Sequence, residues 1–336
     1  MPKSSKTLKT LQTLHGNINL PAFFPDATYG KIKGLESKEL LKCKVDGVVV
    51  NAYHIFKNNL LGKISKIGIH KYMKFNKPII SDSGGFQVMS LIHNHKNGKI
   101  LNKGAFFTLN NKKILLTPEK CIQLQLKIKS DIIMCLDECT MPDISFSKQK
   151  ESVGRTINWA RRCKKYFDKK TKNMRKKPLL FAIVQGGNNK RLRRYCAQQL
   201  IKLNFDGYSF GGFPIKNKKL LTGILRYVAE LLPDDKPKYA MGIGKPDDII
   251  KCVKMGYNLF DCVIPTRDAR HKRLYVWKDK KKLKHSTLNI RTSNKKIRKL
   301  ANLFKTDYAL AVKRATMHNL GFYGELMNEL RKKYTD

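Results

Sequence analysis

Three aspartates stand where apolar runs of the sequence end. Asp82 ends the run "KPIISD", Asp137 follows "SDIIMCL", and Asp261 follows "NLF". A single aspartate after an apolar run often caps a helix. Three carboxylates in one cleft would suit chemistry at a glycosidic carbon, because one can act as a nucleophile while another transfers protons.

Groups that suit a flat, polar ligand accompany these aspartates. Glycine pairs expose the backbone, a phenylalanine offers a face for stacking, and a glutamine offers an amide. A carboxylate that accepts from ring and amino N–H groups, together with amide and backbone donors for a carbonyl oxygen, matches guanine better than adenine. The candidate residues are Ser83, Gly84, Gly85, Phe86, Gln185, Gly211 and Gly212.

Two arginines, Arg267 and Arg270, follow Asp261 by six and nine residues. Arginine suits both phosphate contact and bidentate readout of guanine, so this spacing predicts cations beside the carboxylate. The alternative is a pair of arginines on an ordinary solvated surface.

Eight short apolar runs, each ending in polar or glycine-rich residues and followed by a helical pattern, must position these groups. Apolar strands that alternate with helices indicate a parallel sheet buried on both faces. Eight such units predict an α/β fold, the (β/α)8 barrel, with one active face at the strand ends. A doubly wound open sheet is the alternative, but "PDATYG" after the first run is not a nucleotide-binding glycine fingerprint. The runs span residues 20–30, 45–54, 77–87, 130–140, 178–187, 205–212, 238–246 and 258–267.

Other segments show local patterns. Residues 117–129 predict a helix with Thr117 as its N-cap, and residues 150–170 predict an amphipathic helix whose arginines face solvent. The charged stretch 277–286 indicates a loop or hairpin, and 295–336 has apolar residues at helical spacing. We therefore expect one domain over residues 1–336, in which about 285–336 form a reduced C-terminal helical subdomain.

Composition limits the class of protein. The chain has 336 residues, 41% of them hydrophobic, which is enough for a buried core. Because it has no apolar run of about 18 residues and no secretory signal, we expect a cytoplasmic protein, with an organellar transit peptide as the alternative. The formal charge of +44 suits a polyanionic partner, but the lysine-rich composition typical of an AT-rich genome explains it equally well.

The eight cysteines are scattered, with none in a CxxC pair and none beyond Cys262. Such cysteines are most often core thiols in a reducing compartment. Their spacing indicates no structural zinc site.

The order of the motifs resembles that of the tRNA-guanine transglycosylases. The motifs are "SDSGGFQVMSL", "SDIIMCLDECT", "FAIVQGG", "FDGYSFGGF", "YAMGIGKPDD", "FDCVIPTRDAR" and "MHNLGFYGELM", and the resemblance runs from about residue 15 to the end. It implies a (β/α)8 barrel and an enzyme of queuosine biosynthesis. Such an enzyme replaces the wobble guanine of tRNAs with a G-starting anticodon by a 7-deazaguanine.

The resemblance also implies roles for matching residues. Asp261 would attack the anomeric carbon of the ribose and form a covalent RNA–enzyme intermediate, which the incoming base then displaces with retained configuration. Asp82 would be the general acid/base. Asp137, Gln185 and the Gly212 N–H would bind the edge of the base.

The base would be stacked between two side chains, and two segments would contact the RNA. The stacking residues are Phe86 and Met241. The RNA-binding candidates are Gly242, Ile243, Gly244, Lys245, Pro246, Asp247 and Asp248, and then Thr266, Arg267, Asp268, Ala269 and Arg270.

The sequence departs from the family pattern in several places. The zinc-binding CxCxxC segment is missing and His318 alone remains of the ligand set, so we expect no zinc and no other cofactor. Asn217 replaces a glutamate that would steady the base-binding backbone. Ile215 replaces a glycine of queuine-using eukaryotic relatives, which favours 7-aminomethyl-7-deazaguanine over queuine. Asp268 replaces an asparagine and is expected to weaken phosphate contact slightly.

The partners expected from the resemblance are the tRNA anticodon loop, a 7-deazaguanine base and a second copy of the chain, with no membrane. A catalytically impaired RNA-binding partner subunit is one alternative, which the intact aspartates disfavour. An archaeal-type enzyme is another, but it normally carries additional RNA-binding domains. A phosphate-binding metabolic barrel would leave the paired arginines without a purpose.

Overall fold

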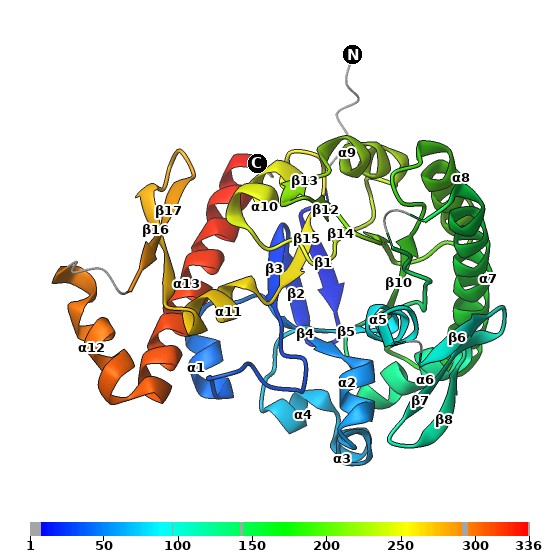
Figure 1. Ribbon diagram of the computed structural model, residues 1–336, viewed down its shortest axis with the longest axis horizontal. Coiled ribbons are helices and arrows are strands. Elements are labelled where there is room, and N and C mark those ends of the chain that lie inside the picture. Colours follow the sequence, from blue (N-terminus) through cyan, green and yellow to red (C-terminus); the bar gives the residue numbers. More distant parts are fainter. Residues whose placement is uncertain (1–7, 96, 142–143, 291–294, 335–336) are drawn as a thin grey trace.

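The computed structural model describes residues 8–95, 97–141, 144–290 and 295–334. Its central element is an eight-stranded parallel sheet in the order β3-β15-β14-β11-β10-β9-β5-β4 (Figure 1). The sheet closes on itself, because Asp26 just after β3 forms a parallel bridge with Val49 of β4. The Ala27 N–H also donates to the Val49 carbonyl at 2.7 Å. The closed sheet confirms the predicted (β/α)8 barrel and excludes the open-sheet alternative.

Each barrel strand lies within one of the eight apolar runs identified in the sequence. The strands are short and consist mainly of buried apolar residues, as expected for parallel strands covered on both faces. They are β3 Ala22–Pro25, β4 Val48–Asn51, β5 Ile79–Asp82, β9 Ile132–Met134, β10 Leu179–Val184, β11 Gly207–Phe210, β14 Lys238–Ala240 and β15 Leu259–Cys262.

Helices follow the strands and cover the outside of the barrel. Helix α6 begins as predicted, because Thr117 Oγ1 accepts a hydrogen bond from the Lys120 N–H at 3.3 Å. Helix α7 begins earlier than predicted, since Ser145 caps it. These helices are α1 Ser37–Lys42, α2 Ala52–Lys57, α3 Leu61–Ile67, α4 Ile69–Met73, α5 Gly85–His95, α6 Pro118–Ile128, α7 Phe146–Thr171, α8 Lys190–Lys202, α9 Thr222–Leu231, α10 Pro246–Val253 and α11 Ile264–Arg270.

Small antiparallel sheets decorate the barrel. A three-stranded sheet lies between α5 and α6, one hairpin precedes β3, and another follows β11. They are β6 Gly98–Leu101, β7 Gly104–Leu109 and β8 Lys112–Leu116; β1 Thr10–Thr13 and β2 Gly16–Asn19; and β12 Ile215–Lys216 and β13 Lys219–Leu220.

Alternate residues of the strands fill the barrel interior. Phe24, Ile80 and Leu259 belong to one buried cluster, which Leu11 and Ile18 of the β1–β2 hairpin extend at one end. Side chains alternate along a strand, so the residue two positions further on points to the same side. The strands β3, β5 and β15 therefore each direct the next inward residue into the mouth of the barrel at its C-terminal end.

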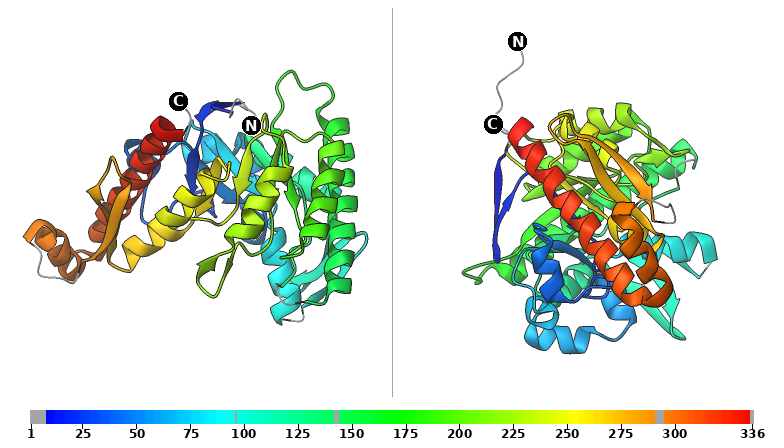
Figure 2. Two further views of the ribbon diagram at one scale, coloured as in Figure 1. Left: turned by 90° about the horizontal axis from the view of Figure 1, so that it is seen from above. Right: turned by 90° about the vertical axis from the view of Figure 1, so that its left-hand side faces the viewer.

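The C-terminal part lies on the opposite side of the barrel from α7 (Figures 1 and 2). It comprises a hairpin and helices, which confirms the hairpin alternative for residues 277–286 and the helical prediction for the described part of 295–336. The subdomain boundary expected near 285 falls inside a strand. The elements are β16 Arg273–Asp279, β17 Lys284–Asn289, the 3-10 helix Lys295–Ile297, α12 Arg298–Thr306 and α13 Tyr308–Tyr334.

Helix α13 is attached to the barrel by specific polar contacts. The Tyr323 hydroxyl donates to the Gly244 carbonyl, and the Asn319 amide donates to two backbone carbonyls at 3.0 Å each. Arg331 pairs with Asp46 at 2.5 Å. Among the described residues, no helix is long and apolar enough to cross a membrane.

Candidate active site

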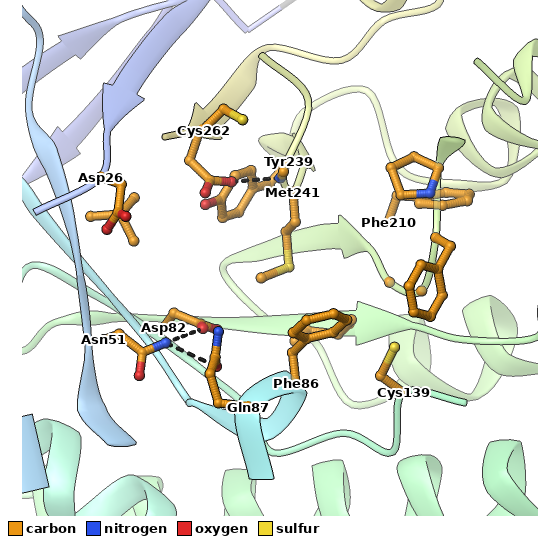
Figure 3. A pocket seen from close by; sticks show the side chains of 18 of the residues that line it. Asp26, Asn51, Asp82, Phe86, Gln87, Cys139, Phe210, Tyr239, Met241 and Cys262 are labelled. Carbon is orange, nitrogen blue, oxygen red and sulfur yellow. Dashed lines mark hydrogen bonds between the residues drawn. The ribbon is translucent and has the colours of Figure 1, made fainter. Parts of the chain in front are cut away.

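A cavity of about 490 Å³ opens at the C-terminal ends of the barrel strands (Figure 3). Its wall contains the three aspartates predicted from the sequence, Asp82, Asp137 and Asp261, and also Asp26, which the sequence analysis did not identify. The volume is typical of a small-molecule site. Strand-end aspartates that are far apart in the chain therefore share one cavity.

The strand order divides the wall into two halves. Strands β15, β3, β4 and β5 are neighbours around the barrel and form what we call the β15–β5 arc; strands β9, β10, β11 and β14 form the β9–β14 arc. The first arc leads to Asp261, Asp26, Asn51 and Asp82, and the second leads to Asp137, Gln185, Gly211 and Met241.

Asp261 is the last but one residue of β15 and is half-buried. Its Oδ1 accepts a hydrogen bond from the Gly242 N–H at 2.8 Å. Burial raises the pKa of Asp261 to about 6, while the hydrogen bonds from Gly242 and from the Tyr239 hydroxyl lower it. At neutral pH the group is therefore mostly a carboxylate, the form that a nucleophile requires.

Asp82, at the end of β5, has a different proton affinity. Burial, and then the negative charges of Asp261 and Asp137, raise the pKa of Asp82 to about 7. Near neutral pH the group is about half protonated, so it can both donate and accept a proton.

Asn51 holds Asp82 in place. Its Oδ1 caps α2 by accepting the His54 N–H at 3.1 Å, which directs its amino group toward the cavity. That amino group donates to Asp82 Oδ2 at 2.8 Å and to Gln87 Oε1 at 3.0 Å (Figure 3). A helix cap thus orients the carboxyl group of Asp82.

Asp137 follows β9 and is buried at the cavity wall. Burial raises its pKa to about 6, and a hydrogen bond from Gln185 lowers it. Gln185 Nε2 donates to Asp137 Oδ2 at 2.6 Å. Gln185 is itself buried and is not among the lining residues. The structure therefore places Gln185 behind Asp137, where it orients the carboxyl group.

The next residue, Glu138, anchors this loop to α7. Arg155 forms two hydrogen bonds to the buried Glu138 carboxylate, at 2.5 and 3.2 Å. Arg162 of the same helix likewise pairs with Glu119. The two arginines remain partly exposed, but each has a carboxylate partner on a neighbouring element, so they are not simply solvated.

Aromatic and sulfur-containing side chains form the apolar part of the wall. Phe86 is 48% exposed and lies beside Phe213, with ring centroids 5.7 Å apart. Met241 projects into the cavity toward Phe86 (Figure 3). Burial raises the pKa of Cys139 and of Cys262 to about 12, so both thiols in the wall are neutral.

The residues just before Phe86 do not line the cavity. Ser83 is buried, and its Oγ accepts the Gly85 N–H at 3.1 Å. Gly84 has a φ of +78°, and a Cβ there would come within 2.3 Å of Tyr53. The glycine is thus required by the turn and by the packing of Tyr53. The expectation that Ser83, Gly84 and Gly85 contact a ligand is not supported.

Gly211 and Gly212 do line the cavity, and a buried arginine holds their backbone. Arg193 donates to the Gly211 carbonyl at 2.9 Å and to the Gly187 carbonyl at 2.8 Å. Burial lowers the pKa of Arg193 to about 10, so it stays charged at neutral pH. Asn217, where the family glutamate was expected to act, instead lies in the β12–β13 turn with a φ of +49°.

The structure narrows the predicted RNA-binding segments, because many of their side chains are buried. Gly242, Lys245, Asp247 and Arg267 are exposed and Arg270 is half-buried. The buried residues are Ile243, Gly244, Pro246, Asp248, Thr266, Asp268 and Ala269.

Asp268 has a structural role that the sequence did not reveal. It accepts hydrogen bonds from Arg273 and from the Tyr275 hydroxyl, both at 2.7 Å, and so fastens α11 to β16. The structure gives no support to the expectation that its charge weakens phosphate contact, since the carboxylate is buried and paired.

A second cavity, of about 660 Å³, adjoins the first and shares Asp26, Thr28 and Val263 with it. Its wall is basic, with Lys31, Lys33 and Arg270. In the described part of the chain, Arg270 Nη1 is buried without a hydrogen-bond partner.

One cluster of potential metal ligands occurs among the described residues: His15, His70 and Asp131, at the opposite end of the barrel. Each imidazole contacts one Asp131 oxygen, at 2.8 and 2.9 Å, and the rings stack at 3.4 Å with an interplanar angle of 13°. In this structure the three side chains therefore form a hydrogen-bonded cluster. His318, the remaining zinc-ligand position, has Nε2 2.7 Å from the Tyr275 carbonyl.

Several wall residues were missed in the sequence. Alternation along the strand gives a signal for one of them, because Asp26 lies two positions after the buried Phe24, just as Asp82 lies two after Ile80. Tyr239 and Cys262 lie in the barrel strands β14 and β15, and the remaining residues lie at strand ends, in helices or in loops whose positions the sequence pattern does not show. The missed residues are Asp26, Asn51, His54, Gln87, Cys139, Phe213, Tyr239 and Cys262.

Comparison with known proteins adds a family to this geometry. Residues 4–335 match the sequence model of the family described as Queuine tRNA-ribosyltransferase. The chain belongs to this family. The queuine tRNA-ribosyltransferase of Blochmanniella pennsylvanica is 38% identical over 333 residues, which cover 94% of this chain and 89% of that protein. Those of Rickettsia bellii and Haemophilus influenzae are 36% and 35% identical, covering 96% and 95% of this chain and 91% and 86% of those proteins.

Family membership confirms the enzyme class predicted from the motifs, a pentosyltransferase that acts on tRNA guanine. For a member of the queuine tRNA-ribosyltransferase family, the cavity at the barrel mouth is the candidate active site. This cavity contains four carboxylates, and a cavity with a basic wall adjoins it.

Proposed function

We propose that this enzyme exchanges the wobble guanine of tRNAs with a G-starting anticodon for a 7-deazaguanine, in queuosine biosynthesis. The proposal rests on the two carboxylates at the ends of the β15–β5 arc. Asp261 and Asp82 face one cavity, with pKa values of about 6 and about 7. Between these values, one group is ionised while the other keeps its proton, as nucleophile and general acid require.

The reaction proceeds by double displacement. An Asp261 oxygen attacks C1′ of the ribose, the C1′–N9 bond breaks, and the departing guanine receives the proton of Asp82 at N9. The incoming base then loses its N9 proton to the Asp82 carboxylate and attacks C1′, which releases Asp261. Two inversions at C1′ give retention of configuration.

The β9–β14 arc would bind the base. Asp137, held by Gln185 at 2.6 Å, accepts from the N–H groups of the guanine edge, and the Gly212 N–H donates to its carbonyl oxygen. Phe86 and Met241 cover the two faces of the ring. Ile215 lines the same cavity, so its bulk favours the small 7-aminomethyl group over queuine as the incoming substituent.

The RNA would enter over the basic side of the mouth. Lys31, Lys33 and Arg270 of the adjoining cavity, together with the exposed Arg267, provide cations for anticodon-loop phosphates. We propose further that the enzyme works in the cytoplasm as a homodimer and without zinc. Sedimentation that shows only monomer at micromolar concentration would refute the dimer.

The test is incorporation of labelled guanine into a tRNA transcript with a G-starting anticodon. Wild type should exchange the base and Asp261→Asn should not. Asp168→Asn, which removes the same charge from an exposed position on α7, serves as the control and should retain exchange. Absence of exchange by wild type, alongside tight tRNA binding, would support instead a catalytically impaired RNA-binding subunit.

A further inference from the structure

A fourth carboxylate, that of Asp26, lies in the wall of the active-site cavity (Figure 3). It follows β3, which pairs with β15 such that Asp261 is opposite Phe24. Asp26 is two residues beyond Phe24 and points to the same side. With strands about 4.8 Å apart and a rise of about 3.3 Å per residue, the Cα atoms of Asp26 and Asp261 are about 8 Å apart. The two residues therefore lie close enough for their side chains to contact the same nucleotide.

One oxygen of Asp26 is used by the protein and the other is available. Oδ1 accepts hydrogen bonds from the Thr28 N–H at 2.9 Å and from the Thr28 hydroxyl at 2.5 Å. None of the described residues donates a hydrogen bond to Oδ2. The turn formed with Thr28 therefore fixes the carboxylate and leaves one acceptor at the cavity wall.

The arrangement of the two arcs determines which part of a nucleotide comes near this oxygen. The inference rests on the proposed function, in which the base lies against the β9–β14 arc. The glycosidic bond then points to the β15–β5 arc, where Asp261 must reach C1′. Asp26 follows the next strand of that arc, so it lies beside the ribose.

In an internal RNA nucleotide, one sugar group can donate a hydrogen bond to Asp26 Oδ2. Its 3′ and 5′ oxygens are esterified, and the 2′-hydroxyl is the sugar group that can donate a hydrogen bond. The carbon that carries it is bonded directly to C1′. We propose that Asp26 is a ribose-binding residue that accepts a hydrogen bond from the 2′-hydroxyl of the nucleotide whose C1′ is attacked by Asp261, and that it thereby makes the enzyme prefer RNA over DNA.

The test compares two anticodon hairpins that differ in one atom, with guanosine or 2′-deoxyguanosine at the exchanged position. For wild type, Asp26→Asn and Asp26→Ser, kcat/KM for labelled guanine incorporation is measured on each hairpin. Asparagine and serine both keep an oxygen for the turn with Thr28, but neither offers a carboxylate to the sugar. Asp168→Asn controls for the loss of a charge.

The proposal predicts that both substitutions reduce the ribose-over-deoxyribose preference by about tenfold, with little change on the deoxyribose hairpin, because a hydrogen bond to a charged group is lost only with ribose. Equal losses on both hairpins would show that Asp26 acts without a contact to the 2′-hydroxyl, and an unchanged preference would also overturn the proposal. If wild type fails to exchange guanine on the ribose hairpin, the proposed function fails and this inference fails with it.

Discussion

Replacing Asp82 by asparagine should make the protein more stable, and more so at high pH. This half-buried residue has its pKa raised from 3.8 to about 7 by desolvation of the carboxyl group and by its two acidic neighbours. A group whose pKa is raised on folding contributes its full stability below the unfolded value of 3.8. Between pH 3.8 and pH 7 the carboxyl ionises in the unfolded state but keeps its proton in the folded state. The free energy of unfolding therefore falls as the pH rises through this range.

The size of the effect follows from the two pKa values. The raised pKa costs at most about 4 kcal/mol of unfolding free energy at pH 8.5 and about 2 kcal/mol at pH 5. On going from pH 5 to pH 8.5, the free energy of unfolding of wild type should therefore fall by about 2 to 3 kcal/mol more than that of Asp82→Asn. The introduced amide can still accept the Asn51 hydrogen bond through its carbonyl oxygen, so the local geometry has a partner in both proteins.

The assay is urea unfolding at pH 5 and pH 8.5, followed by circular dichroism, for wild type, Asp82→Asn and the exposed control Asp168→Asn. The expected result is a gain for Asp82→Asn that grows with pH while the control follows wild type. If the gain is the same at both pH values, the carboxyl is not desolvated in the folded state and the assignment of Asp82 as a proton donor at neutral pH loses its physical basis.

Further predictions concern a buried cation, a hydrogen bond to the proposed nucleophile and the expected independence from metal. Arg193→Met should lower the free energy of unfolding by about 3 kcal/mol, because it leaves buried backbone carbonyls without donors. The control Arg194→Met, at an exposed neighbouring position, should lower it by less than about 1 kcal/mol. Equal effects of the two substitutions in urea unfolding would contradict this prediction. Tyr239→Phe removes a hydrogen bond that lowers the pKa of Asp261. The acid limb of the pH profile of kcat/KM for guanine exchange should therefore move to higher pH. A shift to lower pH would show that the hydroxyl does not stabilise the carboxylate. Prolonged dialysis against a chelator should leave guanine exchange unchanged, and activity that is lost and then restored by zinc would disprove the expected independence from metal.

The barrel could be predicted from the sequence because every one of its strands is a short apolar run with a polar end. This pattern depends only on burial of the sheet on both faces. The three-stranded sheet β6–β8 was not predicted, since its strands lie at the surface and their burial is mixed. The sequence predicted the region of β16–β17 only as a loop or a hairpin, because its charged residues are compatible with both.

The candidate site was predictable to the extent that it consists of strand ends. Asp82, Asp137 and Asp261 meet in one cavity because parallel strands end on the same side of a barrel. The position of Gln185 behind Asp137 could not be read from the sequence, since it depends on the packing of two strand ends.

The burial of Asp268 was equally hidden in the sequence. A motif records which residues are near a site, whereas burial decides which of them face the ligand. Here the carboxylate turns inward because Arg273 and Tyr275 of the adjacent strand provide donors for it.

The central claim is that Asp261 forms a bond to the ribose. The most direct measurement is mass spectrometry of enzyme that has been mixed with a G-starting anticodon hairpin, denatured within seconds and digested. We expect an RNA adduct on the peptide that contains Asp261, which is absent in Asp261→Asn and is lost from wild type when excess guanine is added before denaturation. An adduct on Asp82, or guanine exchange without any adduct under conditions that trap a covalent intermediate, would contradict it.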